Sequence, residues 1–191
     1  VKYFKKKNVK LNNMESKKIS KKMHQIWFQG EDKIPDKYKD NIEKLKKINE
    51  DWEYFLWTDE KLKEECMKFG SECYFKYLSY PYMHQKIDFG RYVVLFNNGG
   101  ISVDMDTIPL KSFNNLPKLE NNKMIVSKMN LNFIETFLMT QMWYCANNAH
   151  IYCPQYNKSM YKVIKKMIKA NPSILMTNSM FDIMWSTGPI G

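Results

Sequence analysis

Glycine and proline are scarce in this sequence, with 7 of each among 191 residues. This scarcity excludes collagen-like and low-complexity classes of protein, which are rich in one or both. Long apolar runs are missing too, and a membrane-spanning helix needs about 18 or more apolar residues in a row. The apolar core of a signal peptide is also absent. We therefore expect a soluble protein in the cytoplasm.

Cysteine is sparse, and its four occurrences form no CxxC pair. Structural zinc sites usually contain such pairs, so the spacing disfavours zinc binding. Isolated cysteines are more often buried free thiols in a reducing compartment. We expect that state for Cys66, Cys73, Cys145 and Cys153.

Most of the chain has almost no net charge, although the total is +10. Residues 1–22 contain nine lysines and one glutamate, so they carry +8 and leave +2 for the rest. We predict that residues 1–22 form a flexible basic arm. The arm is either a solvated tail or a contact for a polyanion or a membrane surface. A nucleic-acid-binding module is disfavoured, because the near-neutral remainder contains no recognisable reader motif.

The remaining sequence predicts one α/β domain. The whole chain is 44% hydrophobic and 15% aromatic, and this composition suits a single core. Short apolar segments alternate with segments of helical periodicity, and that order predicts a mostly parallel sheet flanked by helices. The predicted strands are residues 23–28, 52–57, 100–106, 123–127 and 149–153, and the predicted helices are 36–48, one after Thr58, 83–98 and about 156–170.

Finer predictions follow from the same patterns. Thr58 is expected to cap the helix that follows it, because Asp59 and Glu60 suit the first turn. Gly99 is expected to end the helix over 83–98. The last helix should turn four residues inward, namely Met160, Val163, Ile164 and Met167.

Two aspartates end the predicted strand over residues 100–106. Alternation places Ile101 and Val103 on one face, and Ser102, Asp104 and Asp106 on the other. Unpaired carboxylates at such spacing repel one another, and a divalent cation removes that repulsion. Mg²⁺ and Mn²⁺ bind to one or two carboxylates together with substrate phosphates. Asp104 and Asp106 are therefore candidate metal ligands at a strand end, and the alternative is a solvated turn.

The predicted helix just upstream carries a second charged pair. Asp88 and Arg91 are three residues apart, so they share a helical face in a stretch that is otherwise apolar. Arg91 could hold phosphate oxygens and Asp88 could accept from sugar hydroxyls. The alternative is a local ion pair. His84 shares this face, where we expect a structural polar contact rather than a catalytic group.

These residues belong to a series of blocks that resembles the DXD-containing glycosyltransferases of family 32. That group contains capsular-polysaccharide and mannosyltransferase-like enzymes, and it is related to the glucosylating toxins. The sequence departs from the family consensus at Ile87, Phe96 and Ser102, where serine and two tyrosines are usual. The matching blocks are HQIWFQG, DWEYFLWTDE, KIDFGRYVVLFNNGGISVDMDTIPLKSF, NNAHIYCPQYNKSMYKVIKKM and STGP, and the matching core positions are Asp88, Arg91, Tyr92, Leu95, Gly99, Gly100, Asp104 and Asp106.

The resemblance implies a GT-A fold, a Rossmann-like mixed sheet that binds a nucleotide sugar such as a UDP- or GDP-sugar. It also implies Mn²⁺, or Mg²⁺, bound to the diphosphate. By position, Asp106 would be the direct metal ligand, and Asp104 would contact the ribose or sugar and share the metal through water. Asp88 and Arg91 would hold the sugar hydroxyls and the phosphate.

Further positions follow from the same resemblance. Trp27 would stack on the base, unless it is simply a core residue at a strand end. Asn147 or Asn148 would lie near the transferred sugar, and residues 186–189 would form a turn near the site, whereas Trp185 is expected in the core. Family members commonly continue past that turn. We therefore expect that the domain predicted over 23–191 lacks C-terminal residues, that it is a minimal enzyme, or that its activity is impaired.

The implied activity is retaining glycosyl transfer to a glycan or another hydroxyl acceptor, as in polysaccharide or glycoprotein glycan biosynthesis. The resemblance implies a same-face displacement in which the leaving phosphate deprotonates the acceptor. The metal and Arg91 would stabilise the charge on that leaving group. A relative that binds a nucleotide sugar or glycan without catalysis remains the alternative.

Overall fold

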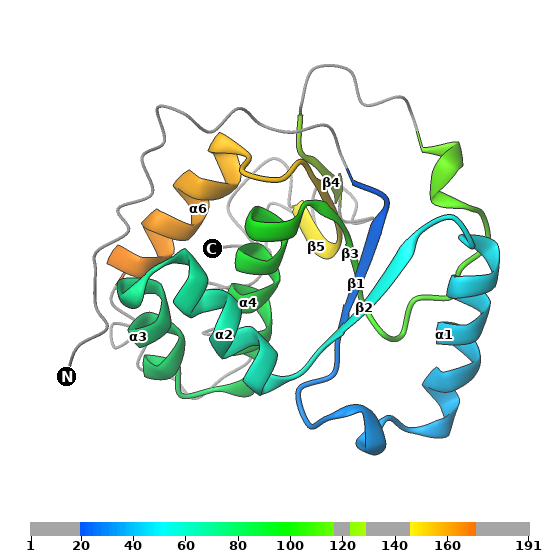
Figure 1. The fold of residues 1–191 in the computed structure, drawn as a ribbon, viewed down its shortest axis with the longest axis horizontal. Helices are drawn as coiled ribbons and strands as arrows, with labels where there is room; N and C mark the ends of the chain where they lie inside the picture. The colour runs from blue at the N-terminus through cyan, green and yellow to red at the C-terminus, as the bar shows by residue number, and fades with distance from the viewer. Residues whose placement is uncertain (1–19, 117–122, 129–145, 171–191) are drawn as a thin grey trace, which may run out of the picture.

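The computed structural model describes residues 20–116, 123–128 and 146–170, and the strands among them form one five-stranded sheet (Figure 1). The strand order is β2-β1-β3-β5-β4. Strand β1 pairs in parallel with β2 and β3, whereas β5 is antiparallel to β3 and β4, so β5 alone runs against the other four. The predicted mixed, mostly parallel sheet is confirmed. The strands are β1 (Lys22–Ile26), β2 (Glu53–Trp57), β3 (Gly100–Val103), β4 (Ile125–Lys128) and β5 (Ala146–Cys153).

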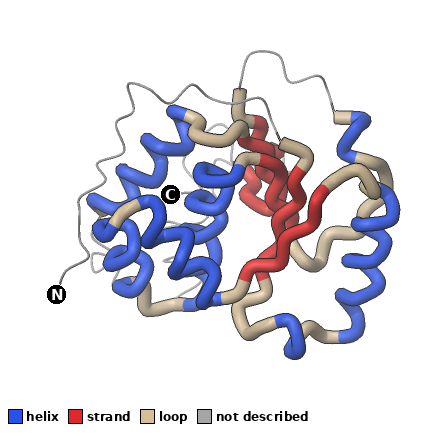
Figure 2. Tube along the Cα trace, in the orientation of Figure 1, coloured by secondary structure: helices blue, strands red, loops and turns tan. Residues whose placement is uncertain are grey.

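Helices cover both faces of the sheet and make three layers (Figures 1 and 2). Among the described helices, α1 lies on one side of the sheet, and the other four pack as a group on the other side. Within the described ranges, no helix combines the length and the apolar character needed to span a bilayer. The helices are α1 (Asp36–Ile48), α2 (Asp59–Phe69), α3 (Ser71–Ser79), α4 (Met83–Asn98) and α6 (Lys158–Lys169), with short 3-10 turns η2 (Glu31–Lys33) and η3 (Phe113–Asn115).

The core divides according to these layers. The largest cluster lies between the sheet and the four-helix group, and it includes Tyr77, Phe89 and Phe96. Smaller clusters lie on the α1 side, where Ile101 and Val103 pack with Leu45, among others. The alternation predicted for these two strand residues is therefore confirmed.

The predicted strand over 100–106 is too long, because β3 ends at Val103. Asp104 still donates its backbone N–H to the carbonyl of Ala149, but its own carbonyl accepts from the N–H of Thr107, which closes a turn. Met105 is buried against Ile34 and other residues on the α1 side. The expectation that Asp104 and Asp106 share a strand face was therefore wrong, and both lie in a turn that follows the strand.

Three smaller predictions also need correction. Thr58 occupies the predicted N-cap position of α2, but its side chain makes no capping hydrogen bond. Helix α3 was not predicted at all. In α6 the residues Met160, Ile164 and Met167 are buried, whereas Val163 is 37% exposed and does not face inward.

The cysteine prediction holds where the structure describes it. Cys66, Cys73 and Cys153 are buried free thiols, and Cys145 lies outside the described residues. Cys66 is close enough to Cys73 for a hydrogen bond between the thiols, and this contact together with burial raises the pKa of Cys66.

Two glycines at the start of β3, Gly99 just before the strand and Gly100 as its first residue, are required by the path of the chain. Both have positive φ, 66° at Gly99 and 102° at Gly100. A Cβ on Gly100 would lie 2.4 Å from the backbone oxygen of Lys22, and one on Gly99 would lie 2.7 Å from the backbone nitrogen of Gln155. The turn from α4 into β3 thus passes directly against β1 and the segment after β5, and only glycine fits there.

Candidate functional site

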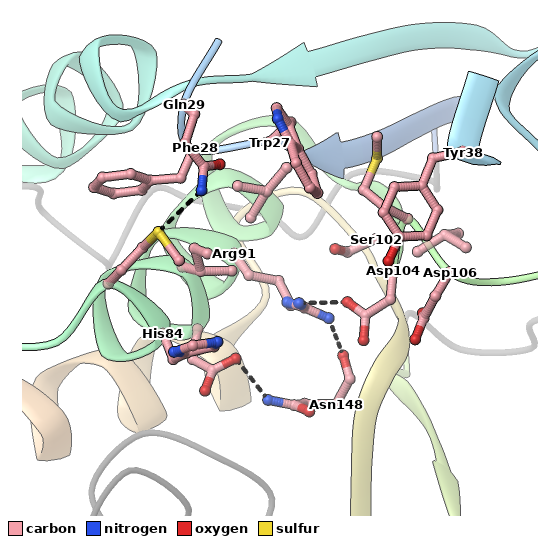
Figure 3. A pocket seen from close by; sticks show the side chains of 16 residues that line it. Trp27, Phe28, Gln29, Tyr38, His84, Arg91, Ser102, Asp104, Asp106 and Asn148 are labelled. Atoms are coloured by element: carbon pink, nitrogen blue, oxygen red, sulfur yellow. Dashed lines mark hydrogen bonds and ion pairs between the residues drawn. The ribbon is translucent and has the colours of Figure 1, made fainter. Parts of the chain in front are cut away.

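A cleft of about 520 Å³ opens where β1 and β3 end. In open α/β sheets, ligands bind at this carboxyl edge of the parallel strands. The cleft is walled by the segments after β1 and β3, the first half of α4, one residue of α1 and one of β5 (Figure 3). It is lined by Ile26, Trp27, Phe28, Gln29, Tyr38, Met83, His84, Ile87, Asp88, Arg91, Ser102, Val103, Asp104, Met105, Asp106 and Asn148.

Helix α4 presents one continuous face to the cleft. His84, Ile87, Asp88 and Arg91 recur at helical spacing, and all four line it. His84 is exposed, and the expectation of a structural polar contact rather than a catalytic group stays a prediction. Asp88 is half-buried and Arg91 is 5% exposed, so burial and charge increase along the face toward β3.

Arg91 connects three elements around the cleft. Its guanidinium forms an ion pair of 2.5 Å with the carboxylate of Asp104 and donates to the backbone oxygen of Asn148 (Figure 3). Its Nε is buried without a hydrogen-bond partner. Burial alone would lower the pKa of Arg91, but the negative charges of Asp104 and Asp88 more than offset that effect and raise it. The group is a permanent cation that carries one buried N–H without a hydrogen-bond partner.

Asn148 joins the charged face of α4 to strand β5. Its side-chain nitrogen donates to Asp88 Oδ1 at 3.0 Å. The same side chain hydrogen-bonds to the hydroxyl of Tyr92, a buried neighbour of Arg91. Burial and the charge of Asp88 raise the pKa of Tyr92 to about 12, so this hydroxyl is protonated at neutral pH. These contacts fix the carboxylate of Asp88 at the wall of the cleft.

The two aspartates of the turn differ in their surroundings. The Asp104 side chain is 34% exposed and pairs with Arg91, whereas Asp106 is exposed. In Figure 3 both carboxylates point the same way from the turn. No group of three or more His, Cys, Asp or Glu side chains gathers at one point within the described ranges. A cation held by one or two carboxylates together with substrate phosphates fits these residues.

Two aromatic rings form another part of the cleft wall. Trp27 lies just after β1, and its ring centroid is 5.7 Å from that of Tyr38 of α1. The indole nitrogen of Trp27 is buried and has no hydrogen-bond partner. An orphaned donor of this kind is uncommon in folded proteins. A bound molecule with an acceptor atom next to an aromatic face would satisfy both features.

The structure brings most of the predicted site residues together. Trp27, Asp88, Arg91, Asp104, Asp106 and Asn148 all line the one cleft. Asn147 does not line it, because its side-chain oxygen accepts from the backbone N–H of Ala149. Residues 185–189 lie outside the described residues.

Sequence reasoning missed Tyr38 and Ser102 as cleft residues. Tyr38 belongs to the apolar face of α1, and nothing in helical periodicity separates a core tyrosine from one at a cleft. Ser102 is 2% exposed and small, and it faces the cleft from β3. Its place opposite Ile101 and Val103 in the strand alternation was the available signal.

Comparison with known proteins agrees with this geometry. Residues 35–123 match the family described as a glycosyltransferase sugar-binding region containing a DXD motif. The chain is 34% identical over 99 residues to inositol phosphoceramide mannosyltransferase 1 of Schizosaccharomyces pombe, covering 48% of this chain and 29% of the relative. It is 30% identical over 121 residues to the initiation-specific alpha-1,6-mannosyltransferase of Candida albicans, covering 61% and 31%.

An uncharacterized glycosyltransferase of Acanthamoeba polyphaga mimivirus is 34% identical over 91 residues, covering 47% of this chain and 36% of the relative. The chain thus spans little more than a third, or less, of the length of these curated relatives. Among solved structures, the PaToxG glycosyltransferase superposes with a TM-score of 0.63 at 20% identity, over 90% of this chain and 66% of that one. The fold is therefore that of a GT-A-type glycosyltransferase, and residues 35–123 are similar to the family of glycosyltransferase sugar-binding regions that contain a DXD motif.

Proposed function

We propose that the chain forms the donor-binding part of a metal-dependent, retaining glycosyltransferase that uses a UDP- or GDP-sugar. The single observation that carries this proposal is the convergence of Asp88, Arg91, Asp104 and Asp106 on one cleft at the carboxyl edge of the sheet. The cleft combines acceptors for hydroxyl groups, a permanent cation and exposed carboxylates. This combination suits a sugar joined to a diphosphate.

The chain's own residues supply binding and charge stabilisation. Asp104 and the Asn148 carbonyl hold the Arg91 guanidinium in place, and its positive charge would attract the phosphate groups of the donor. Asp88, held by Asn148, can accept from sugar hydroxyls. Preorganised groups of this kind stabilise developing charge without reorganising during the reaction. The Trp27 ring would lie against the base.

Asp106 and Asp104 would hold the cation, either Mn²⁺ or Mg²⁺. When bound, that ion would act as a Lewis acid toward the leaving diphosphate. Asp106 is the more available ligand because it is exposed, whereas Asp104 already balances Arg91. The acceptor would carry a hydroxyl group on a glycan, a lipid or a protein-linked sugar, in line with the mannosyltransferase names of the relatives.

The test is donor hydrolysis by the full chain, followed as release of UDP or GDP from a panel of UDP- and GDP-sugars with Mn²⁺. We expect release that EDTA stops and that Asp106→Ala lowers by about 100-fold or more, because the variant loses several kcal/mol of charge stabilisation. Asp106 is preferred to Asp104 for this test, because removing the Asp104 carboxylate would also take away the ion-pair partner of the buried Arg91.

Asp36→Ala is the matched control, because Asp36 is an exposed aspartate that pairs with Lys39 and does not line the cleft. It should release nucleotide at the wild-type rate. Donor binding that raises the melting temperature without any release of nucleotide would identify a non-catalytic nucleotide-sugar-binding relative. If no donor binds and no nucleotide is released, the proposal is refuted.

A further inference from the structure

Gln25 is a buried amide in β1 whose side chain is hydrogen-bonded at both ends. It is 1% exposed and lies beneath the turn that carries the two aspartates. Its Nε2 donates to the backbone oxygen of Asp104 at 3.2 Å, and its Oε1 accepts from the hydroxyl of Tyr54 in β2 at 3.1 Å. A buried amide satisfied in this way is held in one orientation.

The direction of this small network follows from chemistry. A backbone carbonyl can only accept, so the amide must turn its nitrogen toward Asp104 and its oxygen toward Tyr54. The Tyr54 hydroxyl must then donate to Gln25. Burial raises the pKa of Tyr54, which keeps that hydroxyl protonated. Three strands, β2, β1 and β3, are thereby connected through side chains at the point where the aspartate turn begins.

The turn itself is attached on two sides. On the side of β5, Asp104 donates its N–H to the Ala149 carbonyl, and the Thr107 hydroxyl contacts His150 Nε2 at 3.2 Å. On the side of β1, the described contact to the turn's backbone is the one from Gln25. The Asp104 carbonyl also accepts from the Thr107 N–H, so both of its lone pairs are used. Without Gln25 the turn loses its backbone attachment to β1, and it keeps the attachment to β5, the ion pair of Asp104 with Arg91 and the packing of Met105.

We propose that Gln25 is a positioning residue for the metal- and diphosphate-binding turn, and that Tyr54 fixes the orientation of its amide. The inference rests on the proposed function for the role of the turn. Gln25 touches neither donor nor cation, because it does not line the cleft. It acts by holding the Asp104 backbone, and so the direction in which Asp104 and Asp106 project. Such outer contacts commonly tune metal affinity as strongly as some ligands do.

The test compares Gln25→Met, which keeps the length of the side chain but removes its donor, with the wild-type chain. The first measurement is the Kd for Mn²⁺ with UDP or GDP present, by calorimetry at a temperature where both proteins are folded. We expect an increase of about tenfold. The second is hydrogen exchange of the Thr107 amide, which should become faster while the amides of β1 remain protected.

Two further variants keep the proposal falsifiable. Tyr54→Phe removes only the hydroxyl that orients the amide, and it should change both measurements in the same direction but less. Asn49→Leu is the matched control: Asn49 is also a 1% exposed amide, but it hydrogen-bonds to Leu45, Ser112 and Phe113 instead of the turn. It should lower the melting temperature without changing the Kd.

The possible failures can be told apart. If wild type binds neither nucleotide with Mn²⁺, the proposed function fails, and exchange at Thr107 still decides whether Gln25 orders the turn. If wild type binds both and a folded Gln25→Met variant has the wild-type Kd and the wild-type exchange, the positioning role is wrong. A Kd that rises equally in Asn49→Leu would also overturn it, because general destabilisation would then explain the effect.

Discussion

Asp104 and Asp106 tolerate one another because their environments differ. The negative charge of Asp104 is balanced by the buried guanidinium of Arg91, whereas Asp106 is exposed to water. Repulsion between the two is therefore already reduced without a cation. Under the proposed function, Arg91 would serve as counter-ion to Asp104 and would also attract the phosphate groups of the donor. Asp104 of the turn and Arg91 of α4 therefore neutralise each other as an ion pair.

Gly100 gives the sharpest stability prediction for a single residue. An added Cβ would meet the Lys22 backbone oxygen at 2.4 Å, and φ is 102°. Gly100→Ala therefore combines backbone strain with a clash against another strand, and should lower the free energy of unfolding by about 2–4 kcal/mol. Urea unfolding followed by circular dichroism measures this change.

Gly70 provides the comparison for that experiment. Its φ is 152°, also positive, but a Cβ there has nothing within 4 Å. Gly70→Ala should therefore cost only the strain, about 1 kcal/mol. Equal losses in the two variants would show that close approach to β1 does not account for the requirement at position 100.

At the scale of elements, two helices were predicted with the bounds that the structure has. Helices α1 and α4 have the predicted bounds, since each runs between clear start and stop signals. Helix α3 was missed because Phe75 and Leu78 are exposed at 62% and 41%, while Lys76 is buried at 8%, so its apolar pattern is broken. The end of β3 could not be predicted from alternation, because a hydrogen bond between Asp104 and Thr107 and the burial of Met105 decide it.

His24 connects three elements and makes their packing dependent on pH. It is 1% exposed, its Nε2 lies 2.7 Å from the Gly99 oxygen, and its Nδ1 accepts from the Trp57 indole. Burial lowers the pKa of His24 from 6.5 to about 4. The unfolded chain therefore binds the proton more tightly, so stability from this residue is full above pH 6.5 and is lost as the pH falls toward 4.

The gap between the two pKa values corresponds to about 3 kcal/mol in the free energy of unfolding. Urea unfolding at about pH 7 and about pH 4.5 should show most of that loss in the wild type. His24→Gln should be less stable at pH 7 but lose less on acidification. His84→Gln is the control, since His84 is exposed and should leave the slope unchanged. A parallel slope in wild type and His24→Gln would contradict the assignment.

At the scale of the whole molecule, the sequence predicted which residues line the cleft better than it predicted the contacts among them. The spacing of Asp88, Arg91, Asp104 and Asp106, read together with a family resemblance, predicted residues that do share one cleft. The pairing of Arg91 with Asp104, and the link from Asn148 to Asp88, could not be read from spacing, because the partners lie on different elements. Contacts of this kind exist only after α4, β3 and β5 have packed.

Charge is divided unevenly along the chain, and this division makes a final prediction. Residues 1–22 carry +8 of the total +10. If that segment binds a polyanionic surface, replacing five of its lysines by glutamine should weaken binding to anionic vesicles by about 1 kcal/mol per lysine at low salt. Salt should weaken wild-type binding as well, because it screens exposed charges. The substitutions are at Lys2, Lys5, Lys6, Lys7 and Lys10.

The matched control has the same net charge but a different distribution. Five exposed lysines in and just before α1, changed in the same way, should leave vesicle binding near the wild-type level; they are Lys33, Lys37, Lys39, Lys44 and Lys47. Sedimentation with phosphatidylserine vesicles compares the two variants. If both lose binding equally, total charge alone governs the interaction. If wild type does not bind at all, the basic segment is a solvated tail, and membrane or polyanion contact is excluded as its role.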